Sequence, residues 1–119
     1  VTVLVVEDEE AMRECAADAI VEHGYLVHSF VTADAAMEFL ALRAQEVGAV
    51  FTDVGLPGRL DGMGLVALIR ERWPEIRILV TSGDDRIECL LPTKVEFVIK
   101  PWRLADVLQR LDCLLSSGI

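Results

Sequence analysis

Apolar and polar residues alternate in blocks along the chain, and the blocks follow two different periods. Short apolar runs occupy residues 2–6, 25–30, 49–52, 76–81 and 95–99. Between them lie longer segments in which apolar residues recur every three or four positions, which is the spacing of one helix face. Runs that are apolar at nearly every position are typical of parallel strands buried on both faces. The pattern therefore predicts an α/β domain in which strands and helices alternate from end to end.

Helix boundaries are marked by residues that commonly start or stop a helix. Gly24 is a natural C-cap for the first helical segment, Thr32 can cap the second, and Pro74 ends the third. Helices are therefore expected over residues 7–24, 33–45 and 63–73, and from about residue 104 onward. The segment 82–94, between the last two strands, is short and contains Pro92, which leaves room for a helix of only about two turns.

The length and composition are those of one ordinary domain. The 119 residues show no internal repeat or linker, so we expect a single domain over residues 1–119. Hydrophobic residues make up 53% of the chain, enough for a core without disulfide bonds. The three cysteines have no CxxC spacing, and we interpret them as reduced thiols. Cys15 lies on the apolar stripe of the first helix and is expected in the core, whereas Cys113 is expected at the surface.

Charge and segment lengths exclude some classes of function. A formal charge of −9 gives an acidic surface, which the phosphates of nucleic acid repel. The longest apolar stretch, residues 65–69, is far too short to cross a bilayer. The N-terminal apolar run lacks the basic prefix of a signal peptide. We therefore expect a cytoplasmic protein that acts through other proteins, without direct nucleic-acid binding or membrane insertion.

Reactive polar residues lie at the ends of four apolar runs. Glu7 and Asp8 follow the first run, Asp53 closely follows the third, Thr81 ends the fourth, and Lys100 follows the fifth. Parallel strands joined by helical crossovers point the same way, so their carboxyl ends share one edge of the sheet. Ligand sites of open α/β sheets form at that edge. The sequence therefore predicts that these five residues meet in one cleft.

Each of these residues also has an ordinary structural explanation. Asp8 could charge or cap the first helix, Asp53 could begin a turn, Thr81 could cap the next segment, and Lys100 could be a solvated loop residue. A chance gathering of five complementary residues on one edge is improbable, however. Crowded carboxylates need a cation, and hard oxygen ligands suit Mg²⁺. An aspartate can then act as the nucleophile toward a phosphoryl group, with lysine and threonine binding its oxygens.

Four motifs, in order along the chain, are VLVVEDE, FTDVGLPG, LVTSG and FVIKPW. Together they resemble the receiver domain of bacterial two-component response regulators, including the chemotaxis regulators. The resemblance covers essentially the whole chain, and four motifs at suitable separations are highly specific. It implies a doubly wound, flavodoxin-like sheet of five parallel strands in the order 2-1-3-4-5, flanked by five helices.

The resemblance also implies the roles of the residues in the predicted cleft. Asp53 is the position that accepts a phosphoryl group from a sensor histidine kinase or a histidine phosphotransfer protein. Asp8 and Asp53 would bind Mg²⁺ directly, helped by the backbone carbonyl of Gly55, whereas Glu7 would act mainly through water. These functions amount to a phosphorelay module in which the chain catalyses only its own phosphorylation and dephosphorylation.

A conformational switch follows from the same resemblance. Thr81 and Lys100 would contact the phosphoryl oxygens, and Thr81 would move toward the phosphate while Phe97 turns inward behind it. The surface built from the fourth helix, fifth strand and fifth helix would then signal to a protein target that the sequence does not identify. Phe97 would be a core residue in most folds, so its switch role rests on the resemblance alone. The Lys100–Pro101 bond is cis in many relatives.

The chain departs from the usual receiver pattern in three places. The loop PGRLDG is one residue longer than usual, Glu7 stands where Asp is frequent, and the segment between Thr81 and Lys100 is short. We therefore expect a shortened fourth helix and do not transfer the usual output surface to residues 84–94.

Two glycines near the predicted cleft give rise to a further hypothesis. Gly55 and Gly83 lie two residues beyond Asp53 and Thr81, where family members often carry larger side chains. Their small size could open the acyl phosphate to water and shorten its lifetime. The alternative is that both glycines simply permit unusual backbone angles in tight loops.

Two rival functions remain open at this point. A Mg²⁺-dependent phosphohydrolase of the haloacid-dehalogenase type usually needs a second acid two residues after the nucleophile, where this chain has Gly55, so we predict no enzyme acting on external substrates. A pseudo-receiver that binds without phosphorylation is disfavoured because all five residues of the predicted cleft are present. No output domain is expected within this sequence, which could be a free-standing receiver, a phosphate shuttle or a piece of a hybrid kinase.

Overall fold

The computed structural model describes residues 1–116. Its centre is a sheet of five parallel strands in the order β2-β1-β3-β4-β5, as the resemblance implied. The strands are β1 (Thr2–Val6), β2 (Leu26–Phe30), β3 (Val47–Asp53), β4 (Arg77–Ser82) and β5 (Val95–Ile99).

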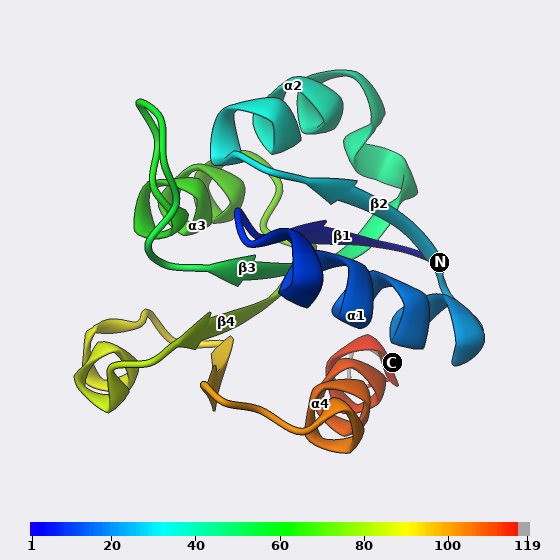
Figure 1. Cartoon of the computed structure of the whole chain (residues 1–119). Helices are drawn as coiled ribbons and strands as arrows, with labels where there is room; N and C mark the ends of the chain where they lie inside the picture. Colours follow the sequence, from blue (N-terminus) through cyan, green and yellow to red (C-terminus); the bar gives the residue numbers. More distant parts are fainter. Residues whose placement is uncertain (117–119) are drawn as a thin grey trace.

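Helices cover both faces of this sheet (Figure 1). The side chains of α1 and α4 pack against one face, and those of α2 and α3 pack against the other. Within residues 1–116 the helices are α1 (Glu10–Glu22), α2 (Ala33–Arg43), α3 (Gly62–Arg72) and α4 (Leu104–Ser116), with short 3₁₀ helices η1 (Ala44–Glu46) and η2 (Asp85–Leu90). None of these helices is long and apolar enough to span a membrane.

The two buried faces explain why the central strands are apolar at almost every position. Leu4 and Val6 of β1 point into the core under α2 and α3, whereas Val3 and Val5 point into the core under α1 and α4. All four are at most 1% exposed. Burial of a side chain of this size contributes about 1.5–3 kcal/mol, so the alternation stabilises both layers at once.

The predicted caps at Thr32 and Gly24 are confirmed, although α1 begins at Glu10 and α2 ends at Arg43, so both helices are shorter than predicted. The Thr32 hydroxyl accepts a hydrogen bond from the Ala35 amide at 3.1 Å and caps α2. Gly24 follows the C-cap residue His23 of α1 and has a φ of 112°, which a side chain would disfavour. The Asp61 carboxylate caps α3 by accepting from the Gly64 amide at 2.8 Å.

The prediction for Cys15 is wrong, because this side chain is exposed. Only Ala16 and Ile20 of α1 are fully buried. Successive residues of an α-helix are turned by about 100°, so the narrow buried stripe of α1 excludes the neighbour of Ala16. Cys113 is exposed as predicted, and the described cysteines are all unpaired.

The segment between β4 and β5 also differs from the usual receiver pattern. The resemblance implied five flanking α-helices, but this segment forms the six-residue 3₁₀ helix η2. Its start is fixed by Asp84, whose carboxylate accepts from the Arg86 amide at 3.0 Å. Pro92 follows two residues after its end and limits its length. The expectation of a shortened fourth helix is therefore confirmed.

A polar cluster joins the C-terminal end of α1 to α4. The Tyr25 hydroxyl donates to Asp112 Oδ1 at 2.6 Å, and His23 Nε2 lies 2.7 Å from Asp112 Oδ2. These hydrogen bonds from Tyr25 and His23 lower the pKa of Asp112. Burial and the neighbouring Asp112 carboxylate raise the pKa of Tyr25 to about 12.

We expect Tyr25, the single tyrosine of the chain, to ionise well above the usual pH. Because its pKa is raised in the folded state, its contribution to stability is present below the unfolded pKa of about 10 and is lost as the pH rises toward 12. Near-ultraviolet absorbance of the phenolate measures this ionisation directly. Asp112→Asn should lower the midpoint pH of Tyr25 ionisation part of the way toward the usual tyrosine value. Asp106→Asn, on the same helix, should leave this midpoint unchanged. Equal midpoints in the two variants would contradict the assignment.

Candidate functional site

The carboxyl ends of the central strands lie level with one another at one edge of the sheet. Asp53 at the end of β3 is the register partner of Thr81 in β4, and Ser82 is the partner of Ile99 in β5. Val6, the last residue of β1, pairs with Thr52. This parallel register brings the residues that follow each strand to the same edge, as the sequence predicted.

Three carboxylates and one ammonium group gather there and form what we call the acidic cleft: Glu7, Asp8, Asp53 and Lys100. One oxygen from each of the three acids lies within 4.8 Å of the others. Lys100 Nζ lies 2.9 Å from Glu7 Oε1 and 2.8 Å from Asp53 Oδ2. The lysine therefore bridges two acids that come from the first and third strands. The bond from Lys100 to Pro101 is cis.

Glu7 is the most buried acid of the cleft, with a relative exposure of 5%. Burial raises its pKa, although the hydrogen bond from Lys100 opposes this effect. Its second oxygen accepts from the Glu9 amide at 3.1 Å, and its backbone carbonyl accepts from the Arg13 guanidinium at 3.1 Å. Arg13 was not predicted to lie at the site; it is the fourth residue of α1, and its side chain reaches back to the loop that follows β1.

The charge on Lys100 is favoured by its surroundings. Burial lowers the pKa of the ammonium group, but its hydrogen bonds to Asp53 and Glu7 outweigh this effect, and the pKa is raised overall. The side chain therefore remains a cation at neutral pH. A fixed positive charge between two carboxylates is suited to bind an oxyanion that forms on either of them.

Thr81 supplies a hydroxyl without a partner at the same edge. The residue is 2% exposed, and its Oγ1 forms no hydrogen bond with any described residue. A buried hydroxyl without a partner is costly, so this atom has hydrogen-bonding capacity to spare for a bound group. Phe97 is also buried, at 7% exposure, but it packs in the core under α2 and α3 and lies outside the acidic cleft.

Gly55 and Gly83 are exposed and leave open space beside the cleft. A Cβ added at either position would meet no atom within 4 Å. The Gly55 amide lies 3.4 Å from Asp53 Oδ1. Positive φ angles occur among the described glycines at Gly24 and Gly58 only, so unusual backbone angles do not explain Gly55 or Gly83. The alternative explanation for these two glycines is therefore wrong.

Gly62 supports the cleft in a way that the sequence analysis missed. It is buried at the start of α3, and its amide donates to the Val54 carbonyl at 2.9 Å. A Cβ there would overlap the backbone carbonyl oxygen of Asp53. The Asp61–Gly62 pair stands in the loop motif PGRLDG, which was the available indication. Gly62 therefore lets α3 approach the loop that carries Asp53.

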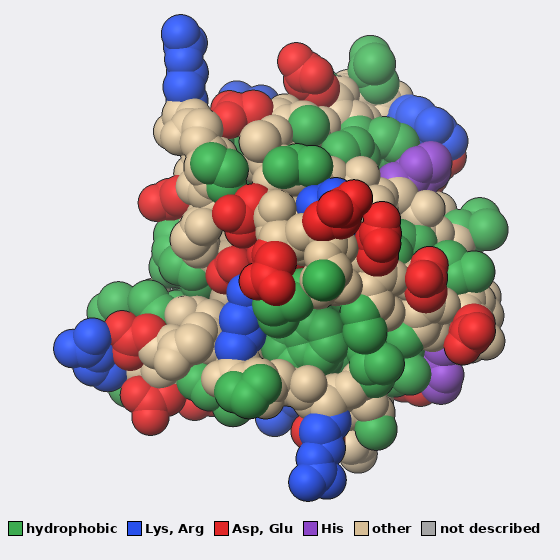
Figure 2. All heavy atoms as spheres, viewed as in Figure 1, with side chains coloured by type: hydrophobic (Ala, Val, Ile, Leu, Met, Phe, Trp, Pro, Cys, Tyr) green, Lys and Arg blue, Asp and Glu red, His purple; other side chains and the backbone are tan. Residues whose placement is uncertain are grey.

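The donor set fits a small divalent cation. Oxygen ligands of Mg²⁺ in proteins are typically one or two carboxylates together with phosphate oxygens and water, and the cleft supplies three carboxylates within reach of one another. Figure 2 shows further acidic side chains along the exposed side of α1. Four exposed acids there are spaced four residues apart: Glu10, Glu14, Asp18 and Glu22. The field at this edge is therefore strongly negative and attracts cations.

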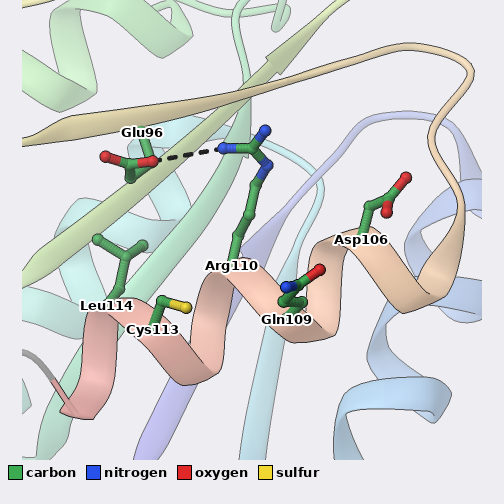
Figure 3. Close-up of a pocket in the computed structure, with 6 residues that line it drawn as sticks. All are labelled: Glu96, Asp106, Gln109, Arg110, Cys113 and Leu114. Carbon is green, nitrogen blue, oxygen red and sulfur yellow. Dashed lines mark hydrogen bonds and ion pairs between the residues drawn. The ribbon is translucent and has the colours of Figure 1, made fainter.

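A cavity of the described chain lies away from the acidic cleft. It has a volume of about 480 Å³ and lies between β5 and α4 (Figure 3). Arg110 reaches across it toward Glu96, with an N–O distance of 3.4 Å. Asp106, Gln109, Cys113 and Leu114 complete its lining. Because its cation is matched by nearby carboxylates and none of the acidic-cleft residues lines it, this cavity is not the candidate site.

Comparison with known proteins gives the same result from sequence and from structure. Residues 3–112 match the model of the response regulator receiver domain family. The chain is 33% identical over 111 residues to the response regulator protein FleR of Pseudomonas aeruginosa, covering 89% of this chain and 23% of FleR. It is 36% identical over 110 residues to the sensor kinase CckA of Brucella abortus, covering 89% of this chain and 12% of CckA.

A solved structure supports the same assignment. The receiver domain of NtrX from Brucella abortus superposes with a TM-score of 0.87 at 28% identity, covering 98% of this chain and 99% of that domain. Because the chain spans less than a quarter of FleR and CckA, the likeness concerns one module of those proteins. Sequence, strand order and superposition agree that the chain belongs to the response regulator receiver domain family, the phosphoacceptor modules of two-component systems.

Proposed function

We propose that Asp53 is the phosphoacceptor of this receiver domain and that the acidic cleft is its phosphorylation site. The observation that carries the proposal is the bridge from Lys100 to both Asp53 and Glu7, beside the unpartnered hydroxyl of Thr81. These observations support the proposal because a carboxylate, a cation and a hydroxyl group lie at one edge of the sheet.

In the proposed reaction, a carboxylate oxygen of Asp53 attacks the phosphorus atom of a phosphohistidine. The phosphorus–nitrogen bond breaks, and its electron pair stays on the imidazole of the donor protein. Lys100 neutralises charge on the phosphoryl oxygens, and Thr81 donates its hydroxyl hydrogen to one of them. Phe97 is buried beneath this edge, and we retain its role as a switch residue as part of the proposal.

Mg²⁺ is the proposed cofactor, with Asp8, Asp53 and the backbone carbonyl of Gly55 as ligands and Glu7 in a supporting role. Bound there, the ion would neutralise part of the charge on the carboxylates and on the incoming phosphoryl group. Asp8 is exposed and Asp53 is half-buried, so both remain accessible from solvent. Glu7 is held by Lys100 and by the Glu9 amide, which favours an indirect role for this residue.

The proposal is tested by incubating the native chain with acetyl phosphate and Mg²⁺ and measuring its intact mass. We expect the native chain to gain one phosphoryl group, and to gain no mass when EDTA replaces Mg²⁺. Borohydride reduction followed by fragmentation should localise the phosphoryl group to Asp53. A phosphorelay role further predicts loss of the group when an unphosphorylated histidine phosphotransfer protein is added. Failure of a folded chain to gain mass would favour the pseudo-receiver instead.

A rival enzymatic function is less well supported by the cleft. A phosphohydrolase of external substrates would need a second acid beside the nucleophile, and Gly55 leaves open space at that position. We therefore propose that the chain catalyses its own phosphorylation and dephosphorylation and no other reaction. Its thiols are unpaired, in keeping with the reducing cytoplasm where sensor kinases act.

The exposed acids of α1 suggest how a partner would approach. They extend along α1, which begins three residues after Glu7 (Figure 2), so we propose that the sensor histidine kinase or phosphotransfer protein carries basic side chains facing α1. Complementary charge of this kind raises association rates at low salt. The downstream partner is proposed to be a protein, without direct nucleic-acid binding or membrane insertion by this domain.

We expect Gly55→Asn to lengthen the lifetime of the phosphorylated domain several-fold. The position is open, so an amide side chain fits there and can obstruct water that approaches the acyl phosphate. Release of inorganic phosphate from the purified phosphoprotein gives the rate, and Gly55→Ala serves as the small-residue control. An unchanged or faster release in Gly55→Asn would show that the open space does not set the lifetime.

A further inference from the structure

A second cavity of the described chain has the opposite charge character from the acidic cleft. Its volume is about 220 Å³, and it lies where α3 ends and where β4 and β5 begin. We call it the basic pocket. It is lined by Pro74, Ile76, Ile78, Thr93 and Val95 together with the basic residues Arg70, Arg77 and Lys94. No carboxylate lines it, although the chain carries a net charge of −9.

The cations of the basic pocket are unpaired, unlike several others of the molecule. Lys100, Arg43, Arg86 and Arg110 each form an ion pair with a carboxylate. Arg70, Arg77 and Lys94 form none with any residue of the described range 1–116. Three like charges around one small cavity repel one another, so a bound anion would relieve this repulsion.

Two local features shape the chain around the basic residues of the cavity. Arg70 Nη1 donates to the Thr93 carbonyl at 2.7 Å and ties α3 to the turn before β5. In that turn the Val95 amide donates to the Pro92 carbonyl, and Lys94 adopts a φ of 73°. This backbone angle normally favours glycine. A lysine therefore stands at a position where glycine would be less strained.

Part of the cavity wall is apolar. Ile76 and Ile78 are 5% and 2% exposed and line the cavity together with the cations. Such walls concentrate the field of nearby charges. Guanidinium groups also match the geometry of tetrahedral oxyanions through paired N–H donors. The cavity is smaller than the roughly 300–1,000 Å³ of typical drug-sized ligand sites, which suits one small anionic group.

We propose that the basic pocket binds a phosphate group, either as inorganic phosphate or as the phosphate of a small ester. The pocket is separate from the phosphorylation site: Arg77 begins β4 and Thr81 lies near its other end, roughly 13 Å away at the rise of a strand. The proposal is independent of the role of Asp53, because it needs neither the acidic cleft nor Mg²⁺.

The test is a titration of ¹⁵N-labelled protein with sodium phosphate, followed by amide chemical shifts, with EDTA present and ionic strength held constant by sodium chloride. We expect saturable shifts at residues 93–95 and at the start of β4. Lys94→Gly, which removes a charge and suits the backbone angle, should weaken binding about tenfold, as expected for loss of one charged contact. Arg70→Gln should weaken it similarly, whereas Arg59→Gln, at an exposed loop cation, should not.

The arms of this titration separate the possible outcomes. Saturation by inorganic phosphate alone would identify the free ion, and tighter binding of adenosine monophosphate would identify a phosphate ester as the ligand. The proposal would be overturned if titration with sodium chloride caused the same chemical shift changes as titration with phosphate. It would also be overturned if phosphate bound Lys94→Gly and Arg70→Gln as tightly as the native protein. Stronger binding of acetate than of phosphate would overturn the choice of phosphate.

Discussion

Asp53→Asn is expected to abolish phosphoryl uptake from acetyl phosphate while leaving the fold intact. The amide has the shape of the carboxylate but is not a nucleophile toward phosphorus, so no acyl phosphate can form. Lys100 keeps its ion pair with Glu7 in this variant, and the loss of one acid reduces repulsion in the cleft. Intact mass after incubation with Mg²⁺ and acetyl phosphate measures the uptake.

Asp61→Asn is the matched control for this variant. It makes the same chemical change eight residues further along, at the N-cap of α3, where asparagine caps about as well as aspartate. We expect it to gain one phosphoryl group like the native chain. Uptake by Asp53→Asn, or its loss in Asp61→Asn with the fold preserved in thermal unfolding, would show that the acceptor has been assigned to the wrong residue.

Gly62→Ala is expected to cost about 3 kcal/mol of stability, the upper part of the usual range for overpacking, and to reduce phosphorylation as well. The added methyl group would overlap the carbonyl oxygen of Asp53, and backbone atoms cannot move aside as a flexible side chain can. Either α3 or the Asp53 loop must shift. For a domain of this size, such a loss lowers Tm by roughly 10 °C.

Gly55→Ala is the control for Gly62→Ala. It shows the effect of replacing a glycine where no backbone atom lies close to the added methyl group. Gly55 has open space around it and no positive φ, so alanine there should leave Tm nearly unchanged. Urea unfolding and calorimetry of both variants, with phosphoryl uptake measured in parallel, provide the comparison. Equal stability of the two alanine variants would mean that α3 does not depend on the contact at Gly62.

The basic pocket and the acidic cleft lie at opposite ends of β4. The acidic cleft could be predicted from the sequence, whereas the basic pocket could not. The acids and Lys100 stand directly after apolar runs, so the parallel-strand rule places them together. Arg70, Arg77 and Lys94 are separated by ordinary polar residues and follow no motif. Their gathering depends on how the end of α3 packs beside the starts of β4 and β5.

Sequence alone determined the alternation of strands and helices, the strand order through the family resemblance, and the residues of the acidic cleft. The alternation and the cleft residues follow from the spacing of apolar residues and from the common direction of parallel strands, whereas the strand order was implied by the resemblance alone. The caps at Thr32 and Gly24 were predictable for the same reason, because a cap acts on its own helix.

Tertiary structure alone decided how much of each helix is covered and which groups meet where a helix approaches the edge of the sheet. The exposure of Cys15 depends on how narrow a stripe of α1 is covered. The bond from Arg13 to Glu7 and the close approach at Gly62 depend on how two helices meet the sheet edge. The spacing of apolar residues along a helix determines which face is buried. How much of that face is covered depends on the elements that pack against it. Those elements become neighbours only when the chain is folded.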